Sequence, residues 1–297
     1  MRRLAALALA GSLVLTGCVS GPPDTSASAS PSGSIEALTV GIDETDKSPT
    51  IDFRQGLAWD TAETSVVWDG DGDHLEAGQP LLLDMYGVSL EDGTEVIDTY
   101  DGFAQSYLLA PELLGDDLYN ALLGVRVGAR ILHVSPAPED NPDGEPPIAI
   151  VVDVLPTRAV GTKVDIGDDL PKVTLASDGT PTVKIPKDLD EPTDLQVVTT
   201  IQGTGTQVRD GDFVKVNFTM VDWDGEELDS SWPDEIAPLE VEVGSGDSIT
   251  AIEEGLLDQT VGSQLLILAP ATYAYPDAGP VVLVVDILDA FTPQESE

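Results

Sequence analysis

The sequence predicts an α+β protein in which two tandem domains each form a curled antiparallel sheet around one short helix. An internal repeat is the first observation behind this expectation. Val127-Gly128 of one copy recurs as Val261-Gly262 of the other, and each copy ends in an apolar run interrupted by one aspartate, Asp153 or Asp286. Because repeats at a fixed spacing are typical of duplicated structural units, we expect two domains of the same fold.

Strands and turns make up most of each copy. The segment from Phe213 to Met220 alternates between two sets of side chains with a period of two, which is typical of a β-strand. Asp92-Gly93 and Asp224-Gly225 predict hairpin turns, because glycine accepts the positive φ that such turns need. Further strands are expected over Gly262 to Ala269 and Val281 to Leu288. The pattern favours one antiparallel sheet per copy.

Each copy also contains one segment with the period of an amphipathic helix. In the second copy it runs from about Thr250 to Leu257. Thr250 and Glu253 have the spacing of a capping box, in which the two side chains satisfy backbone N–H groups at the helix start. In the first copy we expect Asp116 or Asp117 to cap the corresponding helix.

The N-terminus has the pattern of a signal peptide over residues 1–17. Arg2 and Arg3 precede a short apolar run, Leu4 to Leu15, whereas spanning a bilayer takes about 20 apolar residues. The following Leu15-Thr16-Gly17-Cys18 resembles a bacterial lipobox, which implies a diacylglycerol on the thiol of Cys18. An ordinary secreted protein with an incidental cysteine is the alternative. On the first interpretation, lipid anchors the chain on the extracytoplasmic side of the cell membrane.

The rest of the chain divides by composition. Residues 18–34 begin with Cys18 and continue as a Ser- and Pro-rich flexible tether. The two domains are expected over residues 35–159 and 195–293. Residues 160–194 between them are rich in Asp, Pro, Gly and Lys and are interpreted as a linker, in which 172–175 and 182–185 could form accessory strands.

The charge balance excludes some partners. The chain has 54 acidic against 13 basic residues, and such a chain repels nucleic acid and anionic headgroups. We therefore expect no nucleic-acid partner and membrane contact only through the lipid anchor. The acidity is interpreted as a solvated surface, with cation attraction near a cell wall as the alternative. A hydrophobic content of 41% is too high for a disordered chain.

An ordered set of short motifs in the second copy resembles the FK506-binding-protein (FKBP) type of peptidyl-prolyl cis-trans isomerase. The resemblance covers about residues 195–291 and extends through the repeat to about 64–156 in a degenerate form. The motifs that carry it are Asp224-Gly225, Leu228-Asp229-Ser230-Ser231, Glu253-Glu254-Gly255, Val261-Gly262, Pro270-Ala271-Thr272-Tyr273-Ala274-Tyr275 and Val284-Val285-Asp286.

The resemblance implies a site and a chemistry. The barrier to rotation about a peptide bond is about 18–20 kcal/mol, and a dry apolar cavity favours the twisted amide without nucleophile, cofactor or metal. The expected substrates are proline-containing exported polypeptides, bound by a monomer. The catalytic residues implied are Asp229, Tyr275 and, through its backbone N–H, Ile249. The substrate pocket implied is lined by Phe218, Leu228, Ile252 and Val285, although these apolar residues could instead be ordinary core.

In the first copy the implied counterparts are Tyr86, Asp98 and Leu118. Asp98 matches the pocket aspartate only with one inserted residue, and Ile97 stands there otherwise. No tyrosine follows Pro136 as Tyr275 follows Pro270, so we expect the fold without the catalysis. Two other classes stay open for the whole chain: a peptide-holding chaperone module and a scaffold in the cell envelope.

Overall fold

The computed structural model describes residues 32–41, 48–138, 144–176, 180–232, 238–275 and 279–293. The expected signal peptide and Cys18 therefore lie outside the described residues. All described elements belong to one compact unit, Pro31–Glu297. Within the described residues, no helix is long and apolar enough to cross a membrane.

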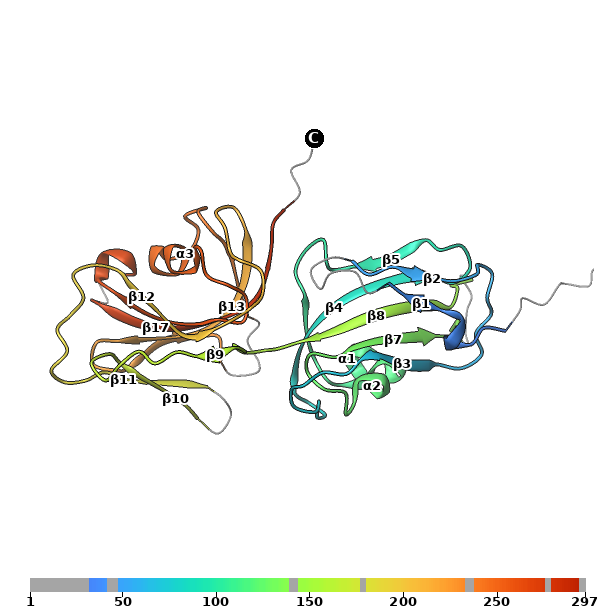
Figure 1. Cartoon of the computed structure of the whole chain (residues 1–297), viewed down its shortest axis with the longest axis horizontal. Helices are drawn as coiled ribbons and strands as arrows, with labels where there is room; N and C mark the ends of the chain where they lie inside the picture. The colour runs from blue at the N-terminus through green and yellow to red at the C-terminus, as the bar shows by residue number, and fades with distance from the viewer. Residues whose placement is uncertain are drawn as a thin grey trace, which may run out of the picture. The chain divides into compact units, whose positions relative to one another are not determined.

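The first sheet is antiparallel and has the strand order β3-β7-β8-β4-β5, with β6 also paired to β4 (Figure 1). Two short helices, α1 (Pro111–Leu114) and α2 (Asp116–Leu122), follow β6 in the chain. The strands are β3 (Glu63–Trp68), β4 (Pro80–Ser89), β5 (Glu95–Asp98), β6 (Gln105–Leu108), β7 (Arg130–Ser135) and β8 (Ile148–Leu155).

The second sheet repeats this order as β12-β16-β17-β13-β14, with β15 also paired to β13 and the short β9 added beyond β12. Its helix is α3 (Thr250–Leu256), and a 3-10 turn, η2 (Ala271–Tyr273), follows β16. The predicted fold class, two sheets with few short helices, is confirmed. The strands are β9 (Thr162–Lys163), β12 (Gln196–Gln202), β13 (Phe213–Asp222), β14 (Glu227–Ser230), β15 (Leu239–Glu242), β16 (Gln264–Ala269) and β17 (Val281–Phe291).

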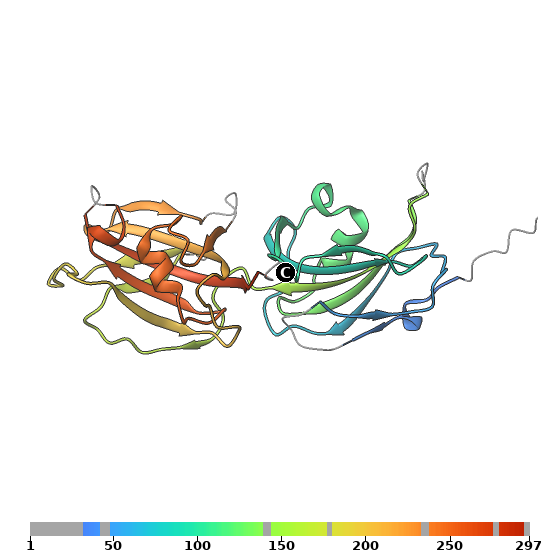
Figure 2. The same cartoon turned by 90° about the horizontal axis from the view of Figure 1, so that it is seen from above.

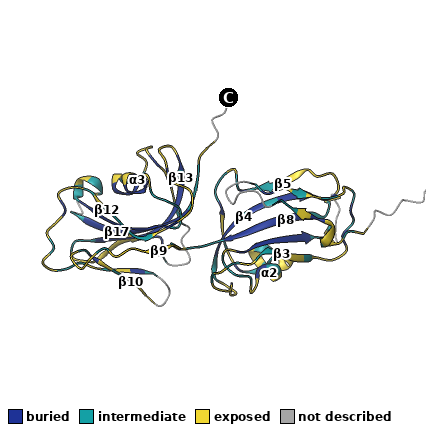
Figure 3. Ribbon diagram, in the orientation of Figure 1, coloured by how far each residue is buried: buried dark blue, intermediate teal, exposed yellow. Residues whose placement is uncertain are grey.

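One face of each sheet packs against the helices. Alternate residues of β13 and β17 point to this side, as the period of two predicts, and they join Ile252 and Leu256 of α3 in one buried cluster. Leu122 of α2 joins the equivalent cluster of the first sheet. Figure 3 shows that the central strands of both sheets are largely buried. We call these two clusters the helix-side clusters.

The opposite face of each sheet is covered by the chain segment that precedes it. In the first domain, η1 (Ile35–Ala37), β1 (Thr39–Val40) and β2 (Ile51–Asp52) belong to this cover, which adds Trp59 to the buried residues. In the second domain, the hairpin of β10 (Lys172–Leu175) and β11 (Pro181–Lys184) covers the sheet. Figures 1 and 2 show cover and helices on opposite sides.

The cover changes the interpretation of residues 160–194. The accessory strands expected there are present, and Val173 and Val183 of the hairpin pack on Val282 and Val284 of β17 in one cluster. Residue Val164 also donates a backbone hydrogen bond to Thr200 of β12. The segment is therefore an integral part of the second domain as well as a connection between the two.

Two expected helix caps are wrong. The residue before α3 is Ile249, Thr250 is already helical, and no side chain caps the helix. The capping box fails because the Glu253 carboxylate accepts hydrogen bonds from other N–H groups, described below. In the first domain, Gly115 (φ 75°) precedes α2, so Asp116 and Asp117 lie within the first turn. Acidic residues there still interact favourably with the helix dipole.

Removing the cover tests its role. A chain that begins at Leu195 would leave Leu266, Leu268, Val282 and Val284 without the hairpin, although each is at most 1% exposed in the structure. Burying one such side chain contributes about 1.5–3 kcal/mol. We expect this chain to be less stable than one beginning at Thr157 by at least about 3 kcal/mol, measured by urea unfolding. Equal midpoints for the two chains would contradict the assignment.

Candidate functional site

Strand pairing in the second domain brings several predicted pocket residues together. Phe218 of β13 lies opposite Val285 of β17, and both belong with Ile252 of α3 to the helix-side cluster. Their exposed fractions are 8%, 0% and 2%, respectively. Tyr273 and Ala274, from η2 and the residue after it, border the same cluster. These residues form an apolar floor between sheet and helix, in which Phe218 is more accessible than Val285 and Ile252.

Ile249 lies at the edge of this floor, immediately before α3. Its side chain packs against the helix-side cluster, and its carbonyl accepts hydrogen bonds from the N–H groups of Ile252 and Glu253, at 2.9 and 3.3 Å. Within the described residues its own N–H has no acceptor. This amide is therefore available as a hydrogen-bond donor, and the role that the resemblance implies for Ile249 stays a prediction.

The loop that leads to Ile249 is held by the buried carboxylate of Glu253. This side chain is 7% exposed and accepts hydrogen bonds from the backbone N–H groups of Gly244, Gly246 and Ser248, at 3.2, 3.1 and 2.9 Å. Hydrogen bonds to an ionised acceptor are stronger than neutral ones. Glu253 thus fixes the backbone on the N-terminal side of Ile249. The spacing of Thr250 and Glu253 predicted a different partner for this carboxylate, and this role was not predicted.

The other predicted site residues lie on more exposed positions. Asp229 pairs with Met220 in the β13–β14 ladder, whereas Val221 pairs with Glu227, so Leu228 is the extra residue of a β-bulge. Leu228 is 43% exposed and Tyr275, which follows η2, is 49% exposed. The Asp229 carboxylate accepts a hydrogen bond from the adjacent Ser230 N–H, at 2.8 Å. Within the described residues, no hydrogen bond joins Asp229 to Tyr275.

In the first domain, strand pairing places the predicted counterparts differently. Asp84 lies opposite Asp153, as Asn217 lies opposite Asp286 in the second domain. The counterpart of Phe218 is therefore Met85, one residue before the predicted Tyr86. Met85 belongs to the helix-side cluster, whereas Tyr86 packs in the cluster beneath the cover.

The same register decides between Asp98 and Ile97. A bulge in the β4–β5 ladder leaves Val96 as the extra residue, in the position of Leu228. Ile97 then corresponds to Asp229, which was the alternative without an inserted residue, and it packs against the helix-side cluster. Asp98 instead accepts a hydrogen bond from the Ser48 hydroxyl at 2.6 Å. Leu118 of α2 packs on the helix-side cluster, as expected for a counterpart of Ile252.

A hydroxyl bridge shared by both domains confirms this register and was not predicted. Thr99 Oγ1 accepts a hydrogen bond from the Met85 N–H at 2.8 Å and donates one to Asp84 at 2.9 Å. Ser231 Oγ accepts one from the Phe218 N–H at 2.8 Å and donates one to Asn217 at 3.0 Å. The available signal was that Thr99 and Ser231 each follow the turn glycine, Gly93 or Gly225, by the same number of residues. The second bridge fixes the backbone at Phe218.

The first domain carries a buried ion pair near this bridge. Arg130 is fully buried, and its Nε and Nη2 each donate to one carboxylate oxygen of Asp153 at 2.5 Å. The Tyr100 hydroxyl donates to the same carboxylate at 2.8 Å, and the Trp68 ring lies 4.1 Å from the guanidinium carbon. Because Tyr100 is buried beside Asp153, its pKa is raised and the hydroxyl keeps its proton.

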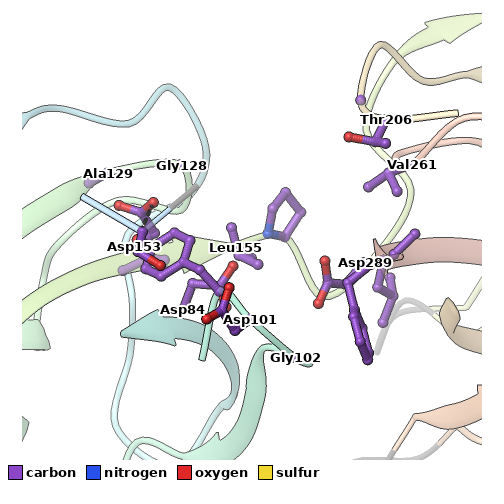
Figure 4. A pocket seen from close by; sticks show the side chains of 18 of the residues that line it. Asp84, Asp101, Gly102, Gly128, Ala129, Asp153, Leu155, Thr206, Val261 and Asp289 are labelled. Carbon is purple, nitrogen blue, oxygen red and sulfur yellow. Dashed lines mark hydrogen bonds between the residues drawn. The ribbon is translucent and has the colours of Figure 1, made fainter. Parts of the chain in front are cut away.

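A cavity of about 730 Å³ adjoins this ion pair (Figure 4). Four carboxylates line it, those of Asp84, Asp101, Asp153 and Asp289. It contains none of the site residues predicted for the second domain. Within the described residues, no group of three or more His, Cys, Asp or Glu side chains has a geometry that could hold a metal ion. The helix-side cluster of the second domain therefore remains the candidate site.

The fold defines an α+β protein. In its second domain, the helix-side cluster lies beside the N-terminus of α3. Residues 204–284 match the family described as FKBP-type peptidyl-prolyl cis-trans isomerase. The FK506-binding protein of Streptomyces anulatus is 32% identical over 91 residues, which cover 30% of this chain and 73% of that protein. The chain belongs to the family of FKBP-type peptidyl-prolyl cis-trans isomerases.

Two solved structures are similar at a lower level. The three FKBP domains of wheat FKBP73 give a TM-score of 0.32 and 16% identity, covering 78% of this chain and 95% of that one. FkpA from Escherichia coli gives 0.31 and 23% identity, covering 41% and 53%. Because both superpositions are loose, the assignment of the two domains rests on strand order and pairing.

Asp84 gives a prediction about pH. Burial, together with the nearby Asp289 carboxylate, raises the pKa of Asp84 from 3.8 to about 7. The folded chain thus holds a proton on Asp84 that the unfolded chain releases, so this group's stabilisation is complete below about pH 4 and is lost as the pH rises through about 7. Asp84→Asn should therefore raise the urea midpoint at pH 8, and raise it less at pH 5.

The second domain supplies the reason for choosing asparagine. Asn217 already occupies the equivalent position and accepts the equivalent hydrogen bond from Ser231, so the substitution keeps the acceptor. Unfolding the wild-type chain and the variant at both pH values isolates the contribution of this one group from the other carboxylates. A lower midpoint for the variant at pH 8, or the same difference at both pH values, would contradict the assigned pKa.

Proposed function

We propose that the second domain catalyses the cis–trans isomerisation of prolyl peptide bonds. Membership of the family supports the type of reaction. The observation that carries the proposal is the buried floor of Phe218, Ile252 and Val285, with the Ile249 N–H at its edge, which has no acceptor among the residues that the structure describes. In this proposal Ile249, Asp229 and Tyr275 are the catalytic residues that contact the substrate.

The chemistry needs only binding and removal of water. Amide resonance maintains the barrier, and the planar, polar form is the one that water solvates best. The proline ring would rest on Phe218, while the Ile249 N–H holds a substrate carbonyl in place. Apolar surroundings then favour the twisted, less polar amide, which is differential binding of the transition state. No proton transfer and no covalent intermediate enters this scheme.

We propose that the activity is modest. Phe218 is the one aromatic side chain among the four proposed pocket residues. Leu228, the bulge residue of the neighbouring strand β14, is 43% exposed. A less complete apolar enclosure excludes water less well. The first domain, with Ile97 in place of the carboxylate and Met85 in place of Phe218, is proposed to have no isomerase activity.

We further propose that Cys18 carries the lipid and that the tether holds both domains at the extracytoplasmic surface of the membrane. This rests on the sequence pattern of residues 1–18. Exported polypeptides arrive there unfolded, and their prolyl bonds isomerise in tens of seconds without a catalyst. Folding of exported proteins is thus the proposed role.

A second candidate is a peptide-holding module that catalyses little. The exposed side chains of Leu228 and Tyr275, 43% and 49% accessible, favour it because they offer apolar surface to an extended chain. Binding without acceleration of isomerisation would support this candidate.

Substitutions in the full chain test the isomerase proposal. We expect Asp229→Asn and Tyr275→Phe each to lower kcat/KM in a proline-limited refolding assay by about tenfold, equivalent to roughly 1.4 kcal/mol of transition-state stabilisation. Tyr86→Phe and Asp98→Asn make the same chemical changes in the first domain and should leave kcat/KM unchanged. No acceleration by the wild-type chain, or equal losses in both domains, would refute the proposal.

Glu253 gives a prediction for a positioning residue. Glu253→Gln removes the charge that three backbone N–H groups share, which should cost about 1–3 kcal/mol of stability. We also expect faster amide exchange at Gly246 and Ser248, and a higher KM for an uncharged prolyl peptide, because the backbone before Ile249 is released. The matched control is Glu254→Gln at the exposed neighbouring position.

A role for Glu253 in stability alone predicts a different result. In that case Glu253→Gln would lower the urea midpoint while KM and kcat for the remaining folded protein stayed at their wild-type values. Measuring both constants well below the unfolding transition separates these outcomes.

A further inference from the structure

Positive charge is absent from the part of the chain that forms the candidate site. From Val216 to Glu297 the sequence contains no lysine and no arginine, and all proposed site residues of the second domain lie within this stretch. The nearest basic residue before it is Lys215. Its side chain is 4% exposed and is occupied by the Ala104 carbonyl and the Glu240 carboxylate, at 2.8 and 3.3 Å.

Exposed carboxylates occur on two described segments that lead into the site, the loop before Ile249 and the turn before β14. Asp247 lies in the loop before Ile249, and its own N–H is fixed by Ser245 Oγ at 3.1 Å. Glu226 lies in the turn before β14, where its N–H binds the Asp222 carboxylate at 2.8 Å. Asp229 follows on β14 itself. The backbones that carry these charges are therefore held in place, although the carboxylates face solvent.

Three basic residues of the second domain lie in or next to the hairpin of the cover, whereas Arg158, Lys163, Arg209 and Lys215 lie outside it. Lys172 and Lys184 lie on the paired strands β10 and β11, and Lys187 follows β11. This hairpin packs on the face of the sheet opposite α3. These three cations therefore lie on the side of the sheet away from α3.

We infer that the site selects prolyl polypeptides that carry lysine or arginine beside the proline, and disfavours acidic flanks. This inference rests on the proposed isomerase function. The physical cause is the summed field of these fixed carboxylates, which no lysine or arginine of residues 216–297 offsets; this field raises the local concentration of basic segments and repels acidic ones. The apolar floor binds the proline, and the surrounding carboxylates determine which proline-containing segments bind best.

Matched peptides test the inference on the full chain. Two peptides share one Leu-Pro core and differ only in having Lys or Glu at the flanking positions, and a third has Gln there. At low ionic strength we expect kcat/KM to be roughly tenfold higher for the Lys peptide than for the Glu peptide, with Gln between them. At 1 M NaCl, where the Debye length is about 3 Å, the ratio should fall towards one.

Charge-neutralising variants locate the effect. Asp247→Asn combined with Glu226→Gln removes two exposed charges beside the site and should reduce the Lys-to-Glu ratio, with the Gln peptide unaffected. Asp188→Asn combined with Asp190→Asn removes two exposed charges from the cover segment and serves as the control. Both variants change the net charge equally, so a difference between them reports position.

The outcomes separate the two proposals. Acceleration that is equal for the Lys and Glu peptides overturns the charge preference and leaves the isomerase function standing. A preference that survives 1 M NaCl, or that both double variants reduce equally, also overturns it, because the local carboxylates would not be its source. No acceleration of any peptide overturns the isomerase function, and the preference with it.

Discussion

Both faces of each sheet are apolar, and the rest of the structure depends on covering each sheet twice. Val282 and Val284 of β17 face the cover, while Val281, Leu283 and Val285 face α3, and all are buried. A sheet of this kind is stable only when two layers remove it from water. The helix therefore has to cross one face, and the preceding segment has to occupy the other. Phe218 and Val285 become the floor of the candidate site because of this arrangement.

The two sheets and their helices could be predicted from the sequence. The period of two in the strands and the repeated motifs remain recognisable even where individual residues differ between the copies. Which residues face the site was harder to predict. A one-residue change of register moves every side chain to the other face of a sheet, and a bulge makes that change without a sequence signal of its own. This shift places Met85 and Ile97 in the positions that were predicted for Tyr86 and Asp98. In the second domain, Phe218, Ile252 and Val285 do lie in one cluster. The capping box at Thr250 failed because Glu253 had three better-placed donors in a loop that local spacing does not describe.

The two domains have diverged in a consistent physical direction. In the second, an apolar floor lies beside an amide that has no acceptor in the described part of the chain, and Asn217 and Ser231 behind it are neutral. In the first, Ile97 fills the position of the carboxylate, and the network behind carries Asp84 and the Arg130–Asp153 pair. The second domain thus keeps an apolar floor beside this donor. In the first domain, the equivalent polar groups form buried hydrogen bonds and an ion pair instead. The proposed functions follow from this contrast between copies of one fold.

The central claim is that a prolyl peptide binds at the edge of the second helix-side cluster, where the Ile249 N–H has no partner in the described residues. The most direct measurement is the change in backbone amide chemical shifts of the full chain during titration with a Leu-Pro peptide. The account predicts a large downfield shift of the Ile249 amide, together with shifts at Phe218 and Tyr275. Shifts confined to the first domain or to the cavity beside Asp84, with Ile249 unmoved, would contradict it.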